Sequence, residues 1–418
     1  MRKVTLLDIG NLSRGKSKHR PRNDEILFGG NYPFVQTSDI KNANHILYKF
    51  EQTYNELGLK QSKLWNKNTI CITIAANIAE SAILGIDACF PDSVIGLEVN
   101  KEIADVHFVE YMLQNYKRIL QYQSYGTSQE NINLQTFEKV YFNIPTLSIQ
   151  KSIAKILYSI DKKIELNNKI NSKLESLVKT LYDYWFVQFD FPDEFGRPYK
   201  SSGGKMVYSD ILKREIPLGW DIELINTRYN FLEGPGITKD KYVSEKGHKF
   251  LNIKCINDEL GDFEIANASM IDYKYIEQYN HFLMKEKDIC ISTSGTLGRF
   301  GVIRKEHLPI LLNTSIIRFR NIVNKISYEY MYAYLRSDLF VAKLNTSASG
   351  SIQKNVGPTH LNEYFEVFPP KKIDDEFSNK LKPIINKTLE LKSETQKLKE
   401  LRDFLLPMLM NGQVTIQQ

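Results

Sequence analysis

Five Lys or Arg side chains fall within nine residues near the start of the chain, in Arg14-Gly-Lys-Ser-Lys-His-Arg-Pro-Arg22. This density of positive charge suits an acidic partner such as a nucleic-acid backbone, although an ordinary solvated loop is also open. The segment completes the pattern G-x-x-x-x-G-K-[ST] over Gly10–Ser17. A phosphate-binding loop must lead into a helix, whereas Pro21 and no apolar stripe follow here. We therefore interpret the match as accidental.

Two further polar loops repeat each other. They read Gly126-Thr-Ser-Gln-Glu-Asn-Ile132 and Gly350-Ser-Ile-Gln-Lys-Asn-Val356. Amide and hydroxyl side chains of this kind can read base edges. If each loop belongs to a module that reads its own base sequence, the residues that touch bases should differ between the two loops. Gln129 recurs as Gln353, and this recurrence favours a structural role for these two residues.

The motifs of catalysis are missing. A methyltransferase needs a Gly-rich cofactor loop and an Asn/Asp-Pro-Pro-aromatic tetrad, and a nuclease needs clustered carboxylates with a Lys; neither set is present. The seven histidines show no metal spacing. The four cysteines are scattered, and we expect Cys71 and Cys290 to be buried in a reducing cytosol. The sequence predicts no catalytic residue, no metal and no cofactor bound by this chain.

The bulk composition is that of a globular protein of two domains. The chain has 418 residues, 42% hydrophobic and 25% charged, with a net charge of +6. It has no apolar run of 18 residues and no signal-peptide pattern at its start, so we expect a cytoplasmic protein without membrane contact.

The elements that position these loops occur twice. The loops share an offset of 350 − 126 = 224, and the same offset joins Pro145 to Pro369. The alternating run Lys3–Ile9 predicts a strand with a counterpart at Trp220–Ile225. Two apolar runs predict a second strand pair, each ending in a turn of small residues. They are Thr69–Ala79 and Asp288–Gly298.

Each half then changes to heptad spacing, with apolar ends and a polar middle. The predicted seam of the first helix is Leu157, Ile160, Ile164, Asn167, Asn171, Leu174, Val178 and Leu181. That of the second is Leu381, Ile384, Thr388, Leu391, Thr395, Leu398, Arg402 and Leu405. Equal lengths and matching layers predict that the two helices pair antiparallel; two helices that each lie on their own module are the alternative.

The resulting fold class is α+β, with two similar globular α/β modules in tandem and two long helices as an antiparallel coiled coil. The expected boundaries are 1–150 for the first module, 151–189 for its helix, 190–215 for a linker, 216–372 for the second module and 373–412 for its helix.

The doubled order of these features resembles the DNA-specificity subunit of type I restriction–modification systems, over nearly the whole chain. The resemblance rests on Pro33-Phe-Val-Gln-Thr-Ser-Asp-Ile40, on Asp288–Gly298, on Ile216-Pro-Leu-Gly-Trp220 and on the Gly-x-x-Gln-x-Asn loops before long helices. Ala76 and Ala79 depart from it, because the second copy has Gly295 and Gly298 there.

The resemblance implies a non-catalytic subunit whose two target-recognition domains each read half of a split double-stranded DNA site, with the coiled coil setting the gap. It implies two modification subunits that methylate adenine with S-adenosylmethionine, and restriction subunits that use ATP and Mg. A fused methyltransferase or nuclease with unrecognised motifs and a coiled-coil protein adaptor remain the alternatives.

Candidate DNA contacts follow from this picture. For phosphates we name Arg14, Lys16, Lys18, Arg20, Arg22, Lys239, Lys241 and Lys354. For bases or sugars we name Thr37, Ser38, Tyr125, Thr127, Ser128, Gln129, Thr293, Ser294, Thr296, Arg299, Ser349, Ser351 and Gln353.

Overall fold

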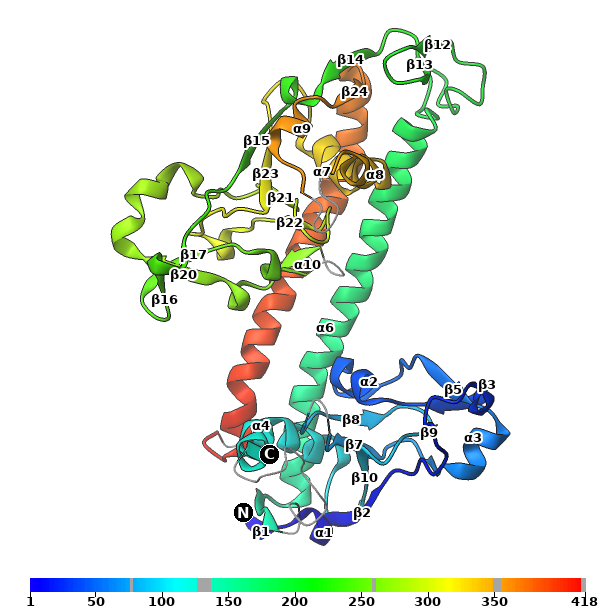
Figure 1. Cartoon of the computed structure of the whole chain (residues 1–418), viewed down its shortest axis with the longest axis vertical. Coiled ribbons are helices and arrows are strands. Elements are labelled where there is room, and N and C mark those ends of the chain that lie inside the picture. The colour runs from blue at the N-terminus through cyan, green and yellow to red at the C-terminus, as the bar shows by residue number, and fades with distance from the viewer. Residues whose placement is uncertain (76–77, 126–136, 138, 258–260, 349–354, 415–418) are drawn as a thin grey trace. The chain divides into compact units, whose positions relative to one another are not determined.

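A computed structural model describes residues 1–75, 78–125, 137, 139–257, 261–348 and 355–414 (Figure 1). The chain divides into two compact units. Unit 1 comprises Met1–Glu165 and Gln396–Gln418, and unit 2 comprises Leu166–Thr395. Each unit contains one of the predicted modules and a part of both long helices. Across the described residues, none of the helices has the length and apolarity needed to cross a bilayer.

The first module is built on a five-stranded sheet with the order β2-β10-β7-β8-β4. Its strands are β2 (Gly10–Arg14), β10 (Val94–Val99), β7 (Ile70–Thr73), β8 (Ser81–Leu84) and β4 (Ile46–Leu47). The pairs are antiparallel except for β4 with β8. Every residue of β7 and β8 is buried, so the apolar run around Cys71 forms the centre of the sheet as predicted.

Shorter elements complete the first module. A second sheet joins β5 (Gln52–Tyr54), β3 (Phe28–Phe34), β9 (Ala88–Cys89) and β6 (Leu64–Trp65). The helices are α1 (Leu6–Ile9), α2 (Thr37–Asn42), α3 (Glu56–Gln61) and α4 (Val106–Tyr125). The strand predicted over Lys3–Ile9 is wrong beyond Val4, because the Asp8 carboxylate accepts the Thr5 backbone N–H (2.7 Å) and hydroxyl (2.9 Å) and so begins a helical turn.

The second module repeats the central sheet with the order β15-β23-β21-β22. Its strands are β15 (Tyr229–Glu233), β23 (Ile316–Asn321), β21 (Ile289–Ser292) and β22 (Phe300–Val302), all antiparallel to their neighbours. These occupy the places of β2, β10, β7 and β8. Helices α7 (Tyr328–Arg336), α8 (Asp338–Ser347) and α9 (Pro358–Leu361) follow the sheet.

Two small sheets distinguish the second module from the first. One has the order β16-β20-β17, from Tyr242–Val243, Ser269–Asp272 and Gly247–Phe250. The other pairs β18 (Ile256–Asn257) with β19 (Asp262–Phe263). The modules therefore share a scaffold and differ in what they add to it.

Each module is closed by a ribbon made from its own first and last strands. In the first module β1 (Arg2–Val4) pairs antiparallel with β11 (Phe142–Ile144). In the second module β14 (Asp221–Leu224) pairs antiparallel with β24 (Phe365–Phe368). A long helix begins directly after each ribbon, so the entry and the exit of each module lie side by side.

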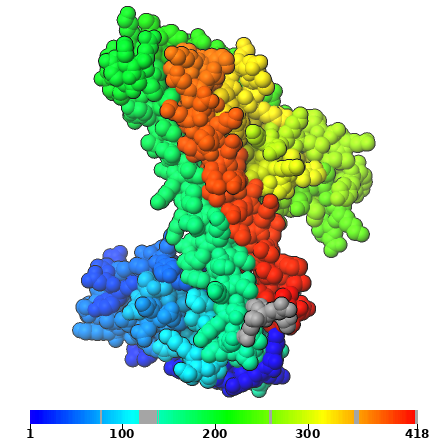
Figure 2. All heavy atoms as spheres, turned by 180° about the vertical axis from the view of Figure 1, so that it is seen from behind, coloured from blue at the N-terminus to red at the C-terminus, as the bar shows by residue number. Residues whose placement is uncertain are grey.

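The two long helices are α6 (Leu147–Tyr182), which continues as a π-helical turn over Asp183–Val187, and α10 (Lys371–Met410). In unit 1, Leu157 shares a core cluster with Leu409, and Asp161 bonds to Arg402. In unit 2, Asn167 bonds to Glu394 and the Trp185 ring contacts Phe377. Numbers that rise along α6 fall along α10, so the helices pair antiparallel in each unit (Figure 1, Figure 2).

The predicted seam residues lie in or beside this contact. Most are buried, among them the polar layers; these are Leu157, Ile160, Ile164, Asn167, Asn171, Val178, Leu381, Thr388, Leu391 and Thr395. Four more are half-buried, namely Leu174, Leu181, Ile384 and Leu398, as is Leu405 near the end of α10.

The segment expected as a polar linker, residues 190–215, contains an ordered hairpin. Strands β12 (Met206–Ser209) and β13 (Arg214–Pro217) pair antiparallel. Phe191 is buried, and its ring lies 5.0 Å from that of Trp220. Aromatic packing therefore orders a stretch whose composition is typical of a loop.

Candidate nucleic-acid interface

The basic segment of the first module follows β2 and is fixed to the fold by its backbone. The Gly15 N–H donates to the Val94 carbonyl at 2.9 Å. The N–H groups of Lys18 and His19 both donate to Oε1 of Gln61, at 2.7 and 3.2 Å. A Cβ at Gly15 would lie 2.3 Å from the Pro91 carbonyl oxygen, so this glycine serves close packing.

The five basic side chains of this segment differ in their partners. Arg22 bonds to the Asp92 carboxylate at 2.6 Å, and Arg20 lies 3.6 Å from the same carboxylate. The remaining three are exposed and pair with no acidic side chain among the residues that the structure describes; they are Arg14, Lys16 and Lys18. These three charges are available to phosphates, whereas the two arginines share a counterion.

Thr37 and Ser38 open α2, close to the polar pair of Gln36 and Gln52. Ser38 is exposed and Thr37 is half-buried. The Gln36 side-chain amide donates to Oε1 of Gln52 at 2.6 Å. Tyr125 is the last residue of α4. The predicted contacts Thr127, Ser128 and Gln129 lie outside the described residues.

In the second module, Lys239 and Lys241 belong to one short 3-10 turn, Lys239–Lys241. The Lys241 ammonium donates to the Tyr279 hydroxyl at 2.7 Å and lies 5.2 Å from the Tyr275 ring centroid. The bond to Tyr279 raises the pKa of Lys241, so this charge persists. Lys239 is exposed. Tyr273 has 57% of its surface exposed. It was not named among the candidate DNA contacts in the sequence, although it lies in the aromatic and basic run Asp272–Tyr275.

The turn between β21 and β22 carries four predicted contacts. Thr293 and Ser294 are 2% and 7% exposed, so their side chains are not available to DNA in this conformation. Thr296 is exposed at the tip and Arg299 is half-buried, with Nη2 3.4 Å from the Thr296 hydroxyl. Ser292 fixes the turn, because its hydroxyl donates to the Thr296 carbonyl at 2.6 Å. The predicted contacts Ser349, Ser351, Gln353 and Lys354 lie outside the described residues.

In unit 1, the half-buried carboxylate of Asp161 on α6 ties the module to both long helices. The Tyr111 hydroxyl of α4 donates to Asp161 at 2.6 Å, and Arg402 of α10 donates to the other oxygen at 3.0 Å. Burial and the neighbouring Asp161 raise the pKa of Tyr111, so it remains a donor. We call this the Asp161 anchor. The sequence placed Arg402 in the heptad seam without showing its partner.

Unit 2 has a second such site, the Glu175 anchor. Glu175 of α6 accepts from the Tyr332 hydroxyl of α7 at 2.7 Å and from Lys392 of α10 at 2.9 Å. Arg336 lies 3.4 Å from the second carboxylate oxygen. Burial opposes ionisation of Glu175, but the charges of Lys392 and Arg336 outweigh it and hold its pKa below the ordinary value. The anchor therefore consists of a paired, buried charge.

The most reactive-looking cluster of the first module is closed to substrate. His45 Nδ1 contacts the Glu110 carboxylate, and His45 Nε2 lies 2.8 Å from Nδ1 of His107. His45 and Glu110 are 2% and 0% exposed. Glu110 also accepts from Ser81 at 3.1 Å, so the serine hydroxyl is bonded to a carboxylate that His45 also contacts. The cluster holds α4 against the sheet.

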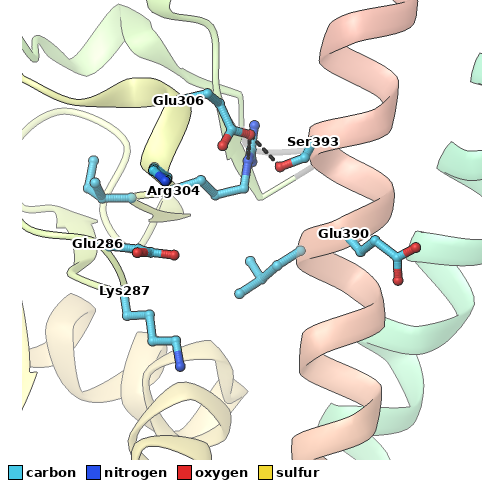
Figure 3. Close-up of a pocket in the computed structure, with 9 residues that line it drawn as sticks. Glu286, Lys287, Arg304, Glu306, Glu390 and Ser393 are labelled. Carbon is cyan, nitrogen blue, oxygen red and sulfur yellow. Dashed lines mark hydrogen bonds and ion pairs between the residues drawn. The ribbon is translucent and has the colours of Figure 1, made fainter.

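A cavity of about 160 Å³ lies between the second module and α10 (Figure 3). Arg304 and Ser393 both bond to Glu306 at its edge, and Lys287 and Glu390 line it further along. Ligand pockets usually reach roughly 300 Å³ or more. Its balanced charges and small size make it a packing defect at a helix contact. No group of three metal-ligating side chains is found within the described residues.

The family model described as "Type I restriction modification DNA specificity domain" matches residues 1–176 and 233–402. The chain is 24% identical to the type I restriction enzyme MjaIX specificity subunit of Methanocaldococcus jannaschii, over 98% of this chain and 93% of that protein. It is also 24% identical to the HindI specificity subunit of Haemophilus influenzae, over 97% and 98%.

Among solved structures, the fold is similar to the S subunit of a type I restriction–modification system from M. genitalium. The TM-score is 0.57 at 15% identity, and the match covers 98% of this chain and 95% of that one. At this identity the likeness shows a common fold.

Proposed function

Because this chain belongs to the type I restriction–modification DNA specificity family, we propose that it reads a bipartite DNA site, with one half-site for each module. Members of this family are specificity subunits, which recognise DNA and leave catalysis to other subunits. The observation that carries the proposal is the duplication. Both modules have the same order of four central strands, a closing ribbon and a long helix after it.

We assign the spacing between the two half-sites to the long helices α6 and α10. Each unit holds α6 against α10 through a carboxylate of α6 that also bonds to a module tyrosine, Asp161 in unit 1 and Glu175 in unit 2. A module bonded to a helix at a defined residue keeps a defined place along that helix. Base choice then resides in the modules and gap length in the helices.

The partners follow from the same proposal. Double-stranded DNA is the ligand, and two modification subunits supply S-adenosylmethionine and adenine methylation. Restriction subunits would add ATP- and Mg-dependent cleavage. The chain itself binds no cofactor in this scheme, and it acts in the cytoplasm, where the DNA of the host lies.

Methylome sequencing tests the proposal. The chain is expressed with its modification subunit in a host that lacks other adenine methylases, and the control host expresses the modification subunit alone. We expect methylated adenines in one split sequence of two fixed halves and a fixed unread gap, present only with this chain. Methylation in the control host at the same sites, or at an undivided site, would overturn the proposal.

A further inference from the structure

The side of α6 opposite its heptad seam is lined by lysines, with a single acid among them. At about 100° per residue, five lysines fall within roughly 40° of one another around the helix axis, and they point away from the seam. We call them the lysine strip: Lys151, Lys155, Lys162, Lys169 and Lys173. Lys162 is half-buried and the other four are exposed. The acid is Glu165, which bonds to Lys162 at 2.8 Å.

The strip is absent from the matching face of α10. The offset of 224 that aligns the two seams also aligns the strip with five residues of α10. They are Asp375, Asn379, Asn386, Ser393 and Lys397, which sum to no net charge against five positive charges on α6. Four of these five positions of α10 are exposed and Ser393 is half-buried against Glu306, so exposure to water alone does not account for the difference. The charge is specific to α6.

The dimensions of the strip fit a DNA duplex. From Lys151 to Lys173 is 22 residues, or roughly 33 Å of helix. One turn of B-DNA is about 34 Å long. Lysine is a flexible point charge that binds phosphate without orienting to a base. A row of lysines with no amide or guanidinium group among them suits contact with DNA whose sequence is not read.

We propose that the lysine strip of α6 binds the phosphate backbone of the unread segment between the two half-sites. This inference rests on the proposed function, because α6 joins the two units that would each hold a half-site. The strip then contributes affinity that is independent of sequence. An acidic surface on a modification subunit is the competing ligand, and the experiment separates the two.

The test uses the full chain in complex with its modification subunits and a duplex that carries the methylated site. The variant is Lys151→Gln/Lys155→Gln/Lys169→Gln/Lys173→Gln. The dissociation constant is measured between 50 and 200 mM salt. Each lost phosphate contact lowers the log–log salt slope by about 0.9, so we expect a slope smaller by roughly 3 to 4. Over that range the variant should lose about 100-fold less affinity than the wild type.

Two matched variants provide the controls. Lys380→Gln/Lys382→Gln/Lys387→Gln/Lys397→Gln removes the same charge from exposed positions of α10 and should leave the slope at the wild-type value. Replacing the four strip lysines by Arg keeps the charge and should also preserve the slope. Because Gln and Lys have similar helix propensities, the variants should fold. If the quadruple variant does not, Lys151→Gln/Lys155→Gln should lower the slope by about 1.8.

The outcomes are distinct. A wild-type slope in the strip variant overturns the inference and leaves the proposed function standing, provided that the split site is still methylated. A variant that keeps its slope but no longer assembles with modification subunits assigns the strip to a protein partner. If the wild type shows no preference for a split site, the proposed function is contradicted, and the inference about the lysine strip is contradicted with it.

Discussion

At the scale of single residues, two carboxylates of α6, one buried and one half-buried, decide how the modules are held. Asp161 and Glu175 each accept a tyrosine hydroxyl from a module helix and a cation from α10. A buried ion pair adds little stability over an apolar pair, but breaking one leaves a charge without a partner. The anchors therefore oppose any arrangement in which the tyrosine, the acid and the base do not meet.

Glu175→Gln should reveal this cost. Gln keeps the shape of the side chain but leaves Lys392, 3% exposed, without its counterion. We expect the free energy of unfolding of unit 2 to fall by about 3 kcal/mol in urea at pH 7. The control is Glu165→Gln, which removes a pair with Lys162 whose side chains are 41% and 42% exposed; it should change the free energy of unfolding by less than about 1 kcal/mol. Equal effects of the two substitutions would contradict a special role for Glu175.

The pH dependence of the same variant has a definite sign. The pKa of Glu175 is held below its ordinary value of 4.5, so the unfolded chain takes up this proton before the folded chain does. The contribution of Glu175 is complete above about pH 4.5 and is lost as the pH falls through the lowered pKa. The stability difference between wild type and Glu175→Gln should therefore shrink below about pH 4.5.

The Asp161 and Glu175 anchors could not be predicted from the sequence, because their partners are far apart along the chain. Heptad spacing placed Arg402 in the seam, but its partner is separated from it by 241 residues. Which side chains meet across such a distance depends on the register of the two helices. The DNA-contacting residues stay predictions, although the burial of Thr293 and Ser294 now argues against those two.

At the scale of elements, the long helices were predictable because their period is sustained. Seams at spacings of three and four define a helix regardless of its surroundings. The structure of the short run Lys3–Ile9 was not predictable. Its alternating pattern covers only seven residues, and a local cap in which Asp8 accepts a hydrogen bond from Thr5 starts a helical turn there. Local hydrogen bonds of this kind compete with strand pairing and leave little trace in hydrophobic pattern.

Lengthening both helices at one level should lengthen the gap in the DNA site. One heptad is inserted after Glu165 in α6 and one after Thr395 in α10, each a copy of the preceding seven residues. These points leave the Asp161 anchor intact on one side and the Glu175 anchor intact on the other. A heptad adds about 10.5 Å of helix, so we expect a gap longer by up to about three base pairs.

Methylome sequencing measures this directly. The two half-sites should be unchanged while the gap grows. As a control, the insertion into α6 alone should destabilise the protein, because the two anchors then lie out of register. New half-site sequences, or an unchanged gap with both insertions in place, would refute the assignment of spacing to the helices.

At the scale of the whole molecule, the duplication was the strongest signal in the sequence. The family resemblance and the fold class are confirmed by the family model and by the shared fold of the M. genitalium subunit. The strand orders of the two modules agree because the apolar runs around Cys71 and Cys290 form the same central strands. The small added sheets were not predicted, because strands of two to four residues carry little periodicity.

Replacing the second module by the first should make the recognised site symmetric. The exchange puts Arg2–Ile144 in the place of Asp221–Phe368. Both junctions then lie at the ends of the ribbon strands. Since α6 and α10 are antiparallel, we expect the first half-site twice, in opposite orientations. Methylome sequencing reads the result, and thermal unfolding controls for folding at the new contacts with α6. Survival of the original second half-site would contradict the assignment of one half-site to each module.

The closing ribbons have a consequence for inheritance. A module whose first and last strands are neighbours can be exchanged as a unit. A crossover within the codons of each ribbon strand would transfer the whole module to another gene. The receiving gene keeps its helices and its anchors on α6. Under the proposed function, one recombination event would change the DNA sequence that is marked, without altering the modification subunits that write the marks.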